Sequence, residues 1–328
     1  MNAGDKVETV RVEGSKCGLP VDTAILFSDK KGVHKPRIEK SKTALLRKLG
    51  FLGKFLGADE RIIFVTTGCS PFTALEQLTM GAAWLIAVKR ALLVFTNKRL
   101  LHIPATTKCE YRGSISQILY QDCKRLQVKG SGLVAEYHSG KKDRFSSIPS
   151  GDRAIIKRFR LEGDASDRPS DQPKRNHLCP NCTQLLPPKA VTCPSCGLEF
   201  KNKSVAVKYS VLLPGGGYFY TGHVFMGIAD ALVESYLFFC TLMLLLAGLL
   251  GEPGAWSGFV VFGLLLALEK LITVHHSNGF LAEFIPRNLK ALLSGQRVPV
   301  EPAPMPAVPP TPTTPEKNQR IEDILSLR

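Results

Sequence analysis

The chain has 328 residues, and its 43 Lys and Arg against 28 Asp and Glu give a formal net charge of +15. This length allows roughly two or three folded units, and the positive charge indicates anionic partners, either phospholipid headgroups or nucleic acid. Only four of the nine cysteines are regularly spaced, which excludes a disulfide framework and indicates a reducing cytosol; the scattered ones are Cys17, Cys69, Cys109, Cys123 and Cys240. The first residues lack the apolar core of a signal peptide, so we expect membrane attachment through the C-terminal third.

The N-terminal part predicts one helix after a loose start. Residues 1–40 are polar and show little periodicity, so we expect them to be loose. An amphipathic helix is expected from Ser41 to Leu56, with Leu45, Leu49 and Leu52 on its apolar stripe. Such a basic helix lies on an anionic membrane or packs on the next domain, and Gly50 and Gly53 favour packing because they weaken a free helix.

Short strands follow between Asp59 and Leu161. A last helix, Gly151–Leu161, is expected after the capping residue Ser150. About seven strands closed by one helix are the layout of a PH-type barrel over residues 41–161. The expected strands are Arg61–Thr66, Trp84–Val88, Leu92–Thr96, Arg99–Ile103, Ile115–Tyr120, Arg125–Val128, Leu133–Tyr137 and Arg144–Ser147.

One hairpin in this region carries a family resemblance. Leu92–Leu101 is an apolar strand, then Thr96-Asn97-Lys98-Arg99, then a second apolar strand, and it resembles the hairpin of bacterial PH-like and GRAM-like domains. The resemblance implies a PH-like fold, whose eukaryotic relatives often bind phosphoinositides or peptides. Gly68–Gly81 departs from it as an insertion. The cations Lys141, Lys142 and Arg144 form either a headgroup patch or a solvated turn.

Two Cys-Pro-x-Cys pairs follow a polar linker at residues 162–177. Cys179, Cys182, Cys193 and Cys196 can present four thiolates to one tetrahedral ion, so residues 178–203 predict a structural zinc ribbon with Zn2+ as its cofactor. The alternatives are an iron site, disulfides or free thiols, and the short gap between the pairs argues against a rubredoxin-like iron site.

Residues 204–290 predict a membrane module. Two apolar stretches near 226–250 and 255–274 are long enough to span a bilayer, and the turn Gly251–Gly254 between them carries no Lys or Arg. The flanking cations therefore predict a multi-pass protein of the cell membrane with both termini cytoplasmic. Leu213–His223, with its glycines and its Tyr-x-Gly pattern, resembles the entry of TM2-like two-helix modules. Residues 291–328 are a Pro-rich tail.

Ionisable residues inside the predicted spans offer a second candidate site. Asp230, Glu234, Glu269 and Lys270 all fall toward the cytoplasmic side, where they form either an ion pathway or a salt bridge that registers the hairpin. Two spans enclose no pore without oligomerising, which favours the salt bridge. His275 and His276, just past the second span, are metal ligands or, as we expect, interfacial residues.

Together these segments predict an α+β multidomain membrane protein: a PH-like β-barrel with a C-terminal helix, a small zinc ribbon and a C-terminal transmembrane hairpin. No phosphate loop, Ser/His/Asp set or paired carboxylates appear in the soluble part, so we do not expect an enzyme. The leading hypothesis is a membrane-anchored adaptor that binds a protein or anionic lipid. A membrane-tethered nucleic-acid binder is the alternative, although only Lys189 is basic between the two cysteine pairs. A small transporter subunit is third.

Overall fold

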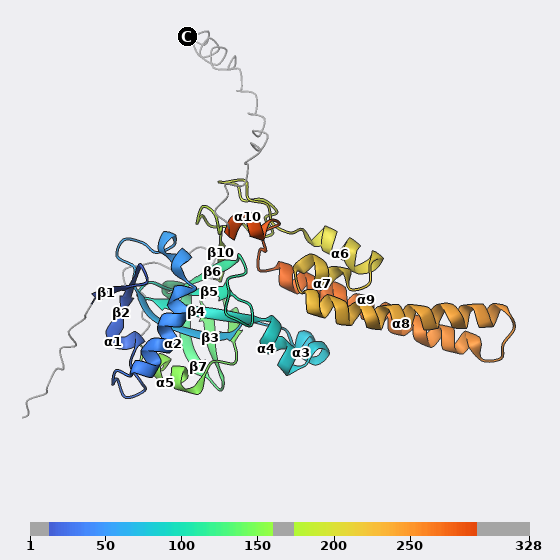
Figure 1. The fold of residues 1–328 in the computed structure, drawn as a ribbon, viewed down its shortest axis with the longest axis horizontal. Coiled ribbons are helices and arrows are strands. Elements are labelled where there is room, and N and C mark those ends of the chain that lie inside the picture. The colour runs from blue at the N-terminus through green and yellow to red at the C-terminus, as the bar shows by residue number, and fades with distance from the viewer. Residues whose placement is uncertain (1–12, 160–173, 294–328) are drawn as a thin grey trace, which may run out of the picture.

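The computed structural model describes residues 13–159 and 174–293, and it places a sheet unit at one end and a long helix pair at the other (Figure 1). The ribbon cysteines and several short helices lie between them. Most of the expected linker and nearly all of the Pro-rich tail lie outside the described residues.

The first sheet is mixed and has seven strands. β4 and β5 form the predicted hairpin. In its turn, the Thr96 hydroxyl oxygen accepts hydrogen bonds from the backbone amides of Lys98 and Arg99 at 3.1 and 3.0 Å. Only β2 and β3 run parallel. The order is β1 (Glu13–Lys16), β2 (Leu19–Asp22), β3 (Ile62–Cys69), β4 (Arg90–Thr96), β5 (Arg99–Pro104), β6 (Ile115–Leu119) and β10 (Asn176–Leu178).

The second sheet is a three-stranded antiparallel meander that follows the short 3-10 helix η2 (Tyr120–Asp122). Its strands are β7 (Cys123–Lys129), β8 (Gly132–Tyr137) and β9 (Lys142–Phe145). An isolated bridge between Cys69 and Ser146 connects the two sheets. The predicted closed barrel is therefore not present among the described residues: two sheets pack against each other, and β1, β2 and β10 extend the first one.

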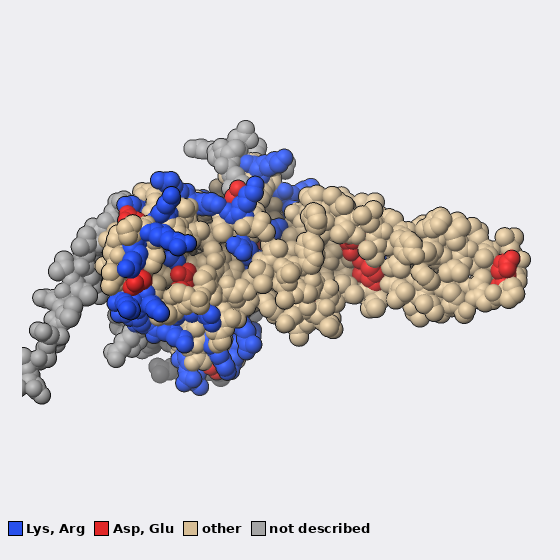
Figure 2. Space-filling view, turned by 60° about the horizontal axis from the view of Figure 1, so that its bottom comes forward, with Lys and Arg blue, Asp and Glu red and all other residues tan. Residues whose placement is uncertain are grey.

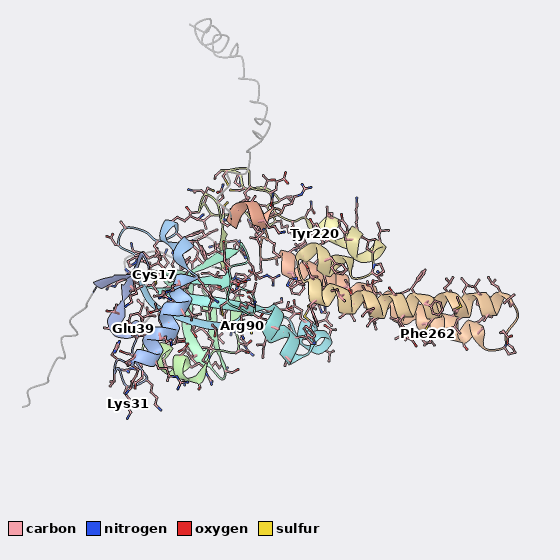
Figure 3. The ribbon with its side chains drawn as sticks, viewed as in Figure 1. Cys17, Lys31, Glu39, Arg90, Tyr220 and Phe262 are labelled. Carbon is pink, nitrogen blue, oxygen red and sulfur yellow. The ribbon has the colours of Figure 1, made fainter. Side chains whose placement is uncertain are left out.

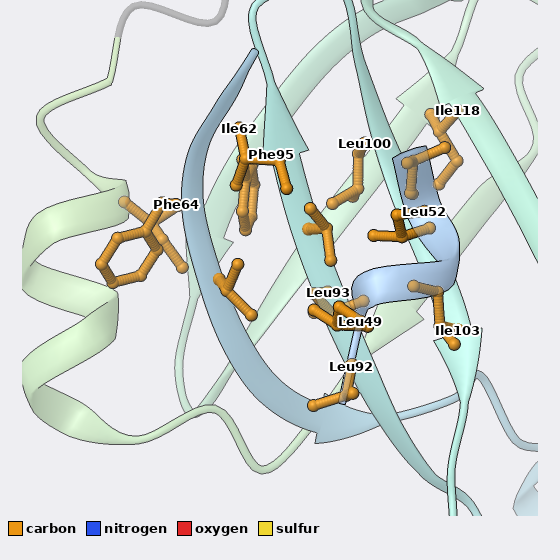
Figure 4. Packing of buried hydrophobic residues seen from close by; sticks show 14 of the residues in the cluster. Leu49, Leu52, Ile62, Phe64, Leu92, Leu93, Phe95, Leu100, Ile103 and Ile118 are labelled. Atoms are coloured by element: carbon orange, nitrogen blue, oxygen red, sulfur yellow. The ribbon is translucent and has the colours of Figure 1, made fainter. Parts of the chain in front are cut away.

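The core lies between these sheets and their covering helices (Figure 4). α2 (Pro36–Arg47) begins at a proline rather than at Ser41, because proline is pre-shaped for the first helical turn. After it the 3-10 helix η1 (Gly50–Lys54) places Leu49 and Leu52, both fully buried, on the first sheet. The expected amphipathic helix is thus split at Gly50, and its apolar stripe faces the protein core.

Two expectations for local structure differ from the fold. Residues 13–40 are not uniformly loose, because Leu19 and Val21 are buried in β2 and α1 (Thr23–Leu26) follows. Trp84–Val88, expected as a strand, lies in α4 (Ala82–Val88), and a capping box at Thr73 and Glu76 starts α3 (Ala74–Met80) before it. Periodicity alone does not separate such a short apolar run from a buried helix.

α5 (Ser150–Ile156) packs on the core through Ile155 and Ile156, and Pro149 rather than Ser150 is its N-cap residue. Lys42 of α2 is buried beside it, where its Nζ lies 2.8 Å from Asp152 Oδ2, 2.7 Å from the Val65 carbonyl oxygen and over the Phe64 ring. Lys42 of this basic helix therefore forms a buried ion pair and does not face the solvent.

The C-terminal helices are α6 (Lys203–Leu212), α7 (Gly216–Thr221), α8 (Val224–Leu249), α9 (Ala255–Leu281) and α10 (Leu289–Leu293). α8 and α9 are antiparallel and mostly exposed, and both are long and apolar enough to cross a membrane. Gly215 makes the bend between α6 and α7 with φ of +66°, and a side chain there would collide with the Gly227 carbonyl oxygen. The bend before the helix pair thus requires a glycine, which accounts for the Gly-rich segment at this place in the sequence.

Candidate functional site

The four predicted cysteines come together in one cluster. Their sulfur atoms all lie within 4.8 Å of one another, and the Cys179–Cys196 and Cys182–Cys193 pairs are 3.6 Å apart. A tetrahedral ion bound at about 2.3 Å would separate its sulfur ligands by about 3.8 Å. The geometry therefore fits a closed four-thiolate metal site, which has no open position for a substrate.

The two cysteine pairs sit in equivalent turns. The amides of Thr183 and Gly197 donate to the carbonyls of Cys179 and Cys193, each at 2.9 Å. Both residues have positive φ, +65° and +69°. Isolated bridges, Leu178 with Leu185 and Thr192 with Glu199, close the turns in the same register. The chain thus builds the same half-site twice.

Backbone amides lower the cost of ionising these thiols. Burial opposes ionisation of Cys196, yet the N–H of Leu198 and the Asn181 side chain bring its pKa below the ordinary value. The amide of Gln184 points at Cys182 in the same way, although burial keeps the pKa of that thiol raised. Because burial also raises the pKa of Cys179, a bound cation is what would stabilise four thiolates in one cluster.

The cysteine cluster is connected by backbone pairing to the sheet on one side and to the residues after α9 on the other. β10, directly before Cys179, pairs with β6 and so completes the seven-stranded sheet. On the other side, Phe200 pairs with Pro286, and backbone hydrogen bonds of 2.9 and 3.0 Å connect Lys201 to Ile285 and Arg287 to Glu199. The residues that follow α9 thus pair with the segment after the last cysteine, and the cysteine cluster is the joint between the sheet and the long helices.

A buried polar network runs through this joint. Arg175 Nη1 donates to Glu283 at 3.0 and 3.2 Å and lies 3.0 Å from His102 Nδ1, while Arg175 Nε lies 3.7 Å from Asp143. His177 Nε2 is 3.3 Å from Glu283. Burial would raise the pKa of Glu283, but Arg175 and His177 hold it well below the usual range. Burial lowers the pKa of His102 to about 3, so its ring is neutral.

Sequence reasoning missed this network. Arg175 fell in the predicted linker, and 108 residues separate it from Glu283. No spacing pattern marks such a pair, and the available signal was one ionisable residue, Glu283, just beyond an apolar helix.

The ionisable residues of the long helices also converge. Lys270 Nζ lies 2.7 Å from Glu234 Oε2 and 3.0 Å from the Ser210 carbonyl oxygen, and the Gly215 amide donates to the same carboxylate at 3.1 Å. The Thr273 hydroxyl lies 3.1 Å from Asp230 and 2.9 Å from Glu269. The ion pair joins α8 to α9, and it also contacts the Ser210 carbonyl of α6 and the Gly215 amide of the bend. This is the arrangement expected of a salt bridge that fixes the register of the two helices.

The remaining predicted residues do not assemble into a site. Lys141, Lys142 and Arg144 are exposed on and beside β9, and Lys142 pairs with Glu136 at 3.2 Å. His276 is buried, with Nδ1 2.6 Å from the Tyr218 hydroxyl and Nε2 2.7 Å from the Thr79 hydroxyl. Both ring nitrogens of His276 are thus satisfied by hydroxyls that tie α9 to α3 and α7.

Comparisons with known proteins identify no family. No family model matches the chain, and no curated protein matches it. The crystal structure of the C-terminal domain of an unknown protein from Leishmania infantum matches with 14% sequence identity and a TM-score of 0.22, covering 36% of this chain and 92% of that domain. A likeness at this level carries no argument, so the site must be interpreted from its own geometry.

We expect the purified chain to contain about one zinc ion, lost when Cys193 and Cys196 are both replaced by serine, because four thiolates make a tight closed site. Elemental analysis of the protein in detergent would measure it, with Cys240→Ser as the matched control. Iron in place of zinc, or full metal content in the double variant, would contradict the assignment.

Lys270→Met should lower the free energy of unfolding by about 3–5 kcal/mol, because it leaves the buried Glu234 carboxylate without its cation. Adding Glu234→Gln should recover a large part of that loss. Denaturant titration in micelles would measure both, with Glu252→Gln at the exposed turn as control. Equal stability of the single and double variants would show that the pair does not register the helices.

Proposed function

We propose that this protein is an integral membrane adaptor that holds a PH-like sheet unit and a zinc site against the cytoplasmic face of a cell membrane and recruits a protein partner there. The observation that carries the proposal is the double fastening of the cysteine cluster, to β6 on one side and to the residues after α9 on the other. This arrangement supports a rigid platform rather than a module on a flexible tether.

The surface of the C-terminal helices supports a bilayer position. Helices of 26 and 27 residues are about 39 Å long, enough for a hydrocarbon core of about 30 Å. In Figure 2, Lys and Arg gather on the sheet unit, whereas the helix pair is almost free of them and shows acidic residues in only two places. No Lys or Arg occurs between Lys208 and Lys270. We infer two spans, with the sheet unit on the side to which both helices return.

Short helices around the cytoplasmic end extend this apolar surface. α3 and α4 lie beside α8 (Figure 1), and Trp84 stacks on Phe225 at 5.4 Å. The large apolar side chains exposed on these short helices are Leu75, Leu78, Trp84, Ile86, Tyr209, Val211, Leu212 and Phe219. Aromatic and aliphatic residues at this level suit the bilayer interface and would anchor the sheet unit at a fixed height.

A groove beside the cysteine cluster is the proposed docking site. It has a volume of about 1300 Å³ and runs between the loop Leu185–Val191 and the chain around Leu281–Phe284. Its apolar lining includes Leu185, 56% exposed, and Val191, 46% exposed, and its rim carries Lys189 and Lys203. No Asp or Glu lines it among the described residues. An acidic protein segment with apolar side chains fits this surface better than nucleic acid, which would require exposed stacking rings.

Topology is the first test. A cysteine introduced at Glu252, in a background without the five scattered thiols, should react with an impermeant reagent from outside the cell, because the turn lies at the far end of the helix pair. A cysteine at Lys141 should react only after permeabilisation. External labelling at Lys141 would overturn the cytoplasmic placement.

The groove predicts a charge-dependent contact. A photo-crosslinking residue at Val191 should form an adduct with an acidic protein in cells, and the Lys189→Glu, Lys203→Glu variant should lose it. The matched control is Lys141→Glu, Arg144→Glu, which should keep it, since a distant patch adds little to steering across a Debye length of about 8 Å. Adducts with nucleic acid, or adducts that survive charge reversal at the rim, would contradict a groove for acidic protein segments.

A further inference from the structure

A small basic cavity lies where the sheet, the end of α4 and the cytoplasmic ends of α8 and α9 meet. Its volume is about 30 Å³, room for about two water-sized groups. Figure 3 shows Arg90 at this boundary between the sheet and α4. Its polar lining consists of Ser70, Lys89, Arg90, Arg112, Ser114 and His223, together with Glu283. We call it the Arg90–Arg112 cavity.

The charges around this cavity do not balance. Lys89 is neutralised by Glu76 at 2.5 Å, and Glu283 is neutralised by Arg175. In residues 13–159 and 174–293 no carboxylate lies within ion-pair distance of Arg90 or Arg112. Within the described residues, the Arg112 guanidinium donates one long hydrogen bond, 3.4 Å to the Val88 carbonyl oxygen. Two guanidinium groups are thus left without an anion in a partly buried place.

Further groups around the cavity also favour an anion. His223 is 9% exposed, and its Nε2 has no hydrogen-bond partner in the part of the chain that the structure describes. Its Nδ1 lies 3.0 Å from the Thr221 hydroxyl, and in the tautomer in which Nδ1 accepts this hydrogen bond, the Nε2–H group can donate to an anion. His223 directly precedes α8, whose first amides add positive partial charge. Lys201 is close enough that burial and the Arg112 charge together lower its pKa. The place would repel a metal ion and attract a small oxyanion.

We propose that the Arg90–Arg112 cavity binds a phosphate group, and that this phosphate belongs to the headgroup of an anionic phospholipid. The inference rests on the proposed membrane placement, which puts the start of α8 at headgroup level. Guanidinium groups bind phosphate oxygens in pairs, which a single ammonium does not. The cavity is too small for a whole metabolite, but it admits an oxyanion whose remainder stays outside.

Apolar neighbours favour a lipid over free phosphate. Val88, Pro104, Gly279, Phe280 and Ile285 complete the lining, and Phe280 stacks on the His223 ring with 3.9 Å between the ring centroids. Val224 and Phe225, directly after His223, are 58% and 69% exposed at the base of the helix pair. An acyl chain leaving the cavity would run along these side chains, whereas a free phosphate would gain nothing from them.

The test uses the full chain in mixed micelles. Binding of phosphatidic acid, of phosphatidylcholine and of inorganic phosphate would be measured for the wild type, for Arg90→Gln with Arg112→Gln, and for the exposed control Lys141→Gln with Arg144→Gln. We expect saturable binding of phosphatidic acid, weakened about tenfold or more in the first variant and unchanged in the control. Competition by inorganic phosphate would identify the phosphate as the recognised group.

Arg90→Lys with Arg112→Lys keeps the charge and should retain part of the binding, which separates loss of the site from loss of folding. Equal affinity for phosphatidylcholine, or undiminished binding by the glutamine variant, would overturn the proposal. Binding of inorganic phosphate alone would overturn the lipid source. Alkaline carbonate extraction distinguishes the two levels: a chain that stays in the membrane but binds no phosphate contradicts only this inference, and a released chain contradicts the membrane placement.

Discussion

The buried carboxylate of Glu283 is the constraint on which the assembly of this molecule depends. Its place, just after a helix long enough to cross a bilayer, takes it out of water at the point where the sheet, the ribbon and the helix pair meet. A buried charge of this kind costs several kcal/mol unless a cation and hydrogen bonds compensate it. Arg175, the residue before β10, supplies the cation, and His177 of β10 supplies a hydrogen bond. Asp143 of β9 lies on the other side of Arg175 and holds it in place. These ion pairs and hydrogen bonds can all form only when β9, β10 and the end of α9 are in place, so we expect the three elements to assemble cooperatively.

A metal ion held by the four cysteines would give this joint its stiffness. The buried cluster around the cysteines contains only Leu186, Leu198 and Phe200 besides the thiols, too little apolar area to fold alone. A bound ion would convert these turns into a rigid block. That block presents β10 to the sheet and Phe200 to Phe284, whose rings meet edge to face at 5.6 Å. A structural ion is therefore useful here for what it positions on each side, and its closed ligand set fits such a role.

Local patterns predicted the parts of the molecule that local chemistry determines. The cysteine spacing, the two apolar helices and the β4–β5 hairpin follow from fixed periodicities and turn residues within a few positions of one another. The sequence did not predict β10, because its pairing with β6 joins segments about sixty residues apart, nor the Arg175–Glu283 pair. Trp84–Val88 was wrongly predicted as a strand because α3 and α4 are stabilised by tertiary contacts, with Met80 and Leu85 packed on Tyr218 and Phe280. The predicted closed barrel is not seen for a similar reason, because strands from outside residues 41–161 extend one of the two sheets instead.

One short segment, Phe280–Ile285, separates the two proposed binding places. Leu281, Ala282 and Phe284 line the groove, while Phe280, Glu283 and Ile285 line the Arg90–Arg112 cavity. The end of α9 and the pairing of Phe200 with Pro286 hold this segment on either side, so a change at one binding place would be felt at the other. A phosphate that orders this segment from the cavity lowers the ordering cost of binding in the groove. Linkage then requires the reverse as well, so a partner in the groove would tighten lipid binding by the same factor. An adaptor built in this way would hold its partner best where the headgroup it recognises is abundant.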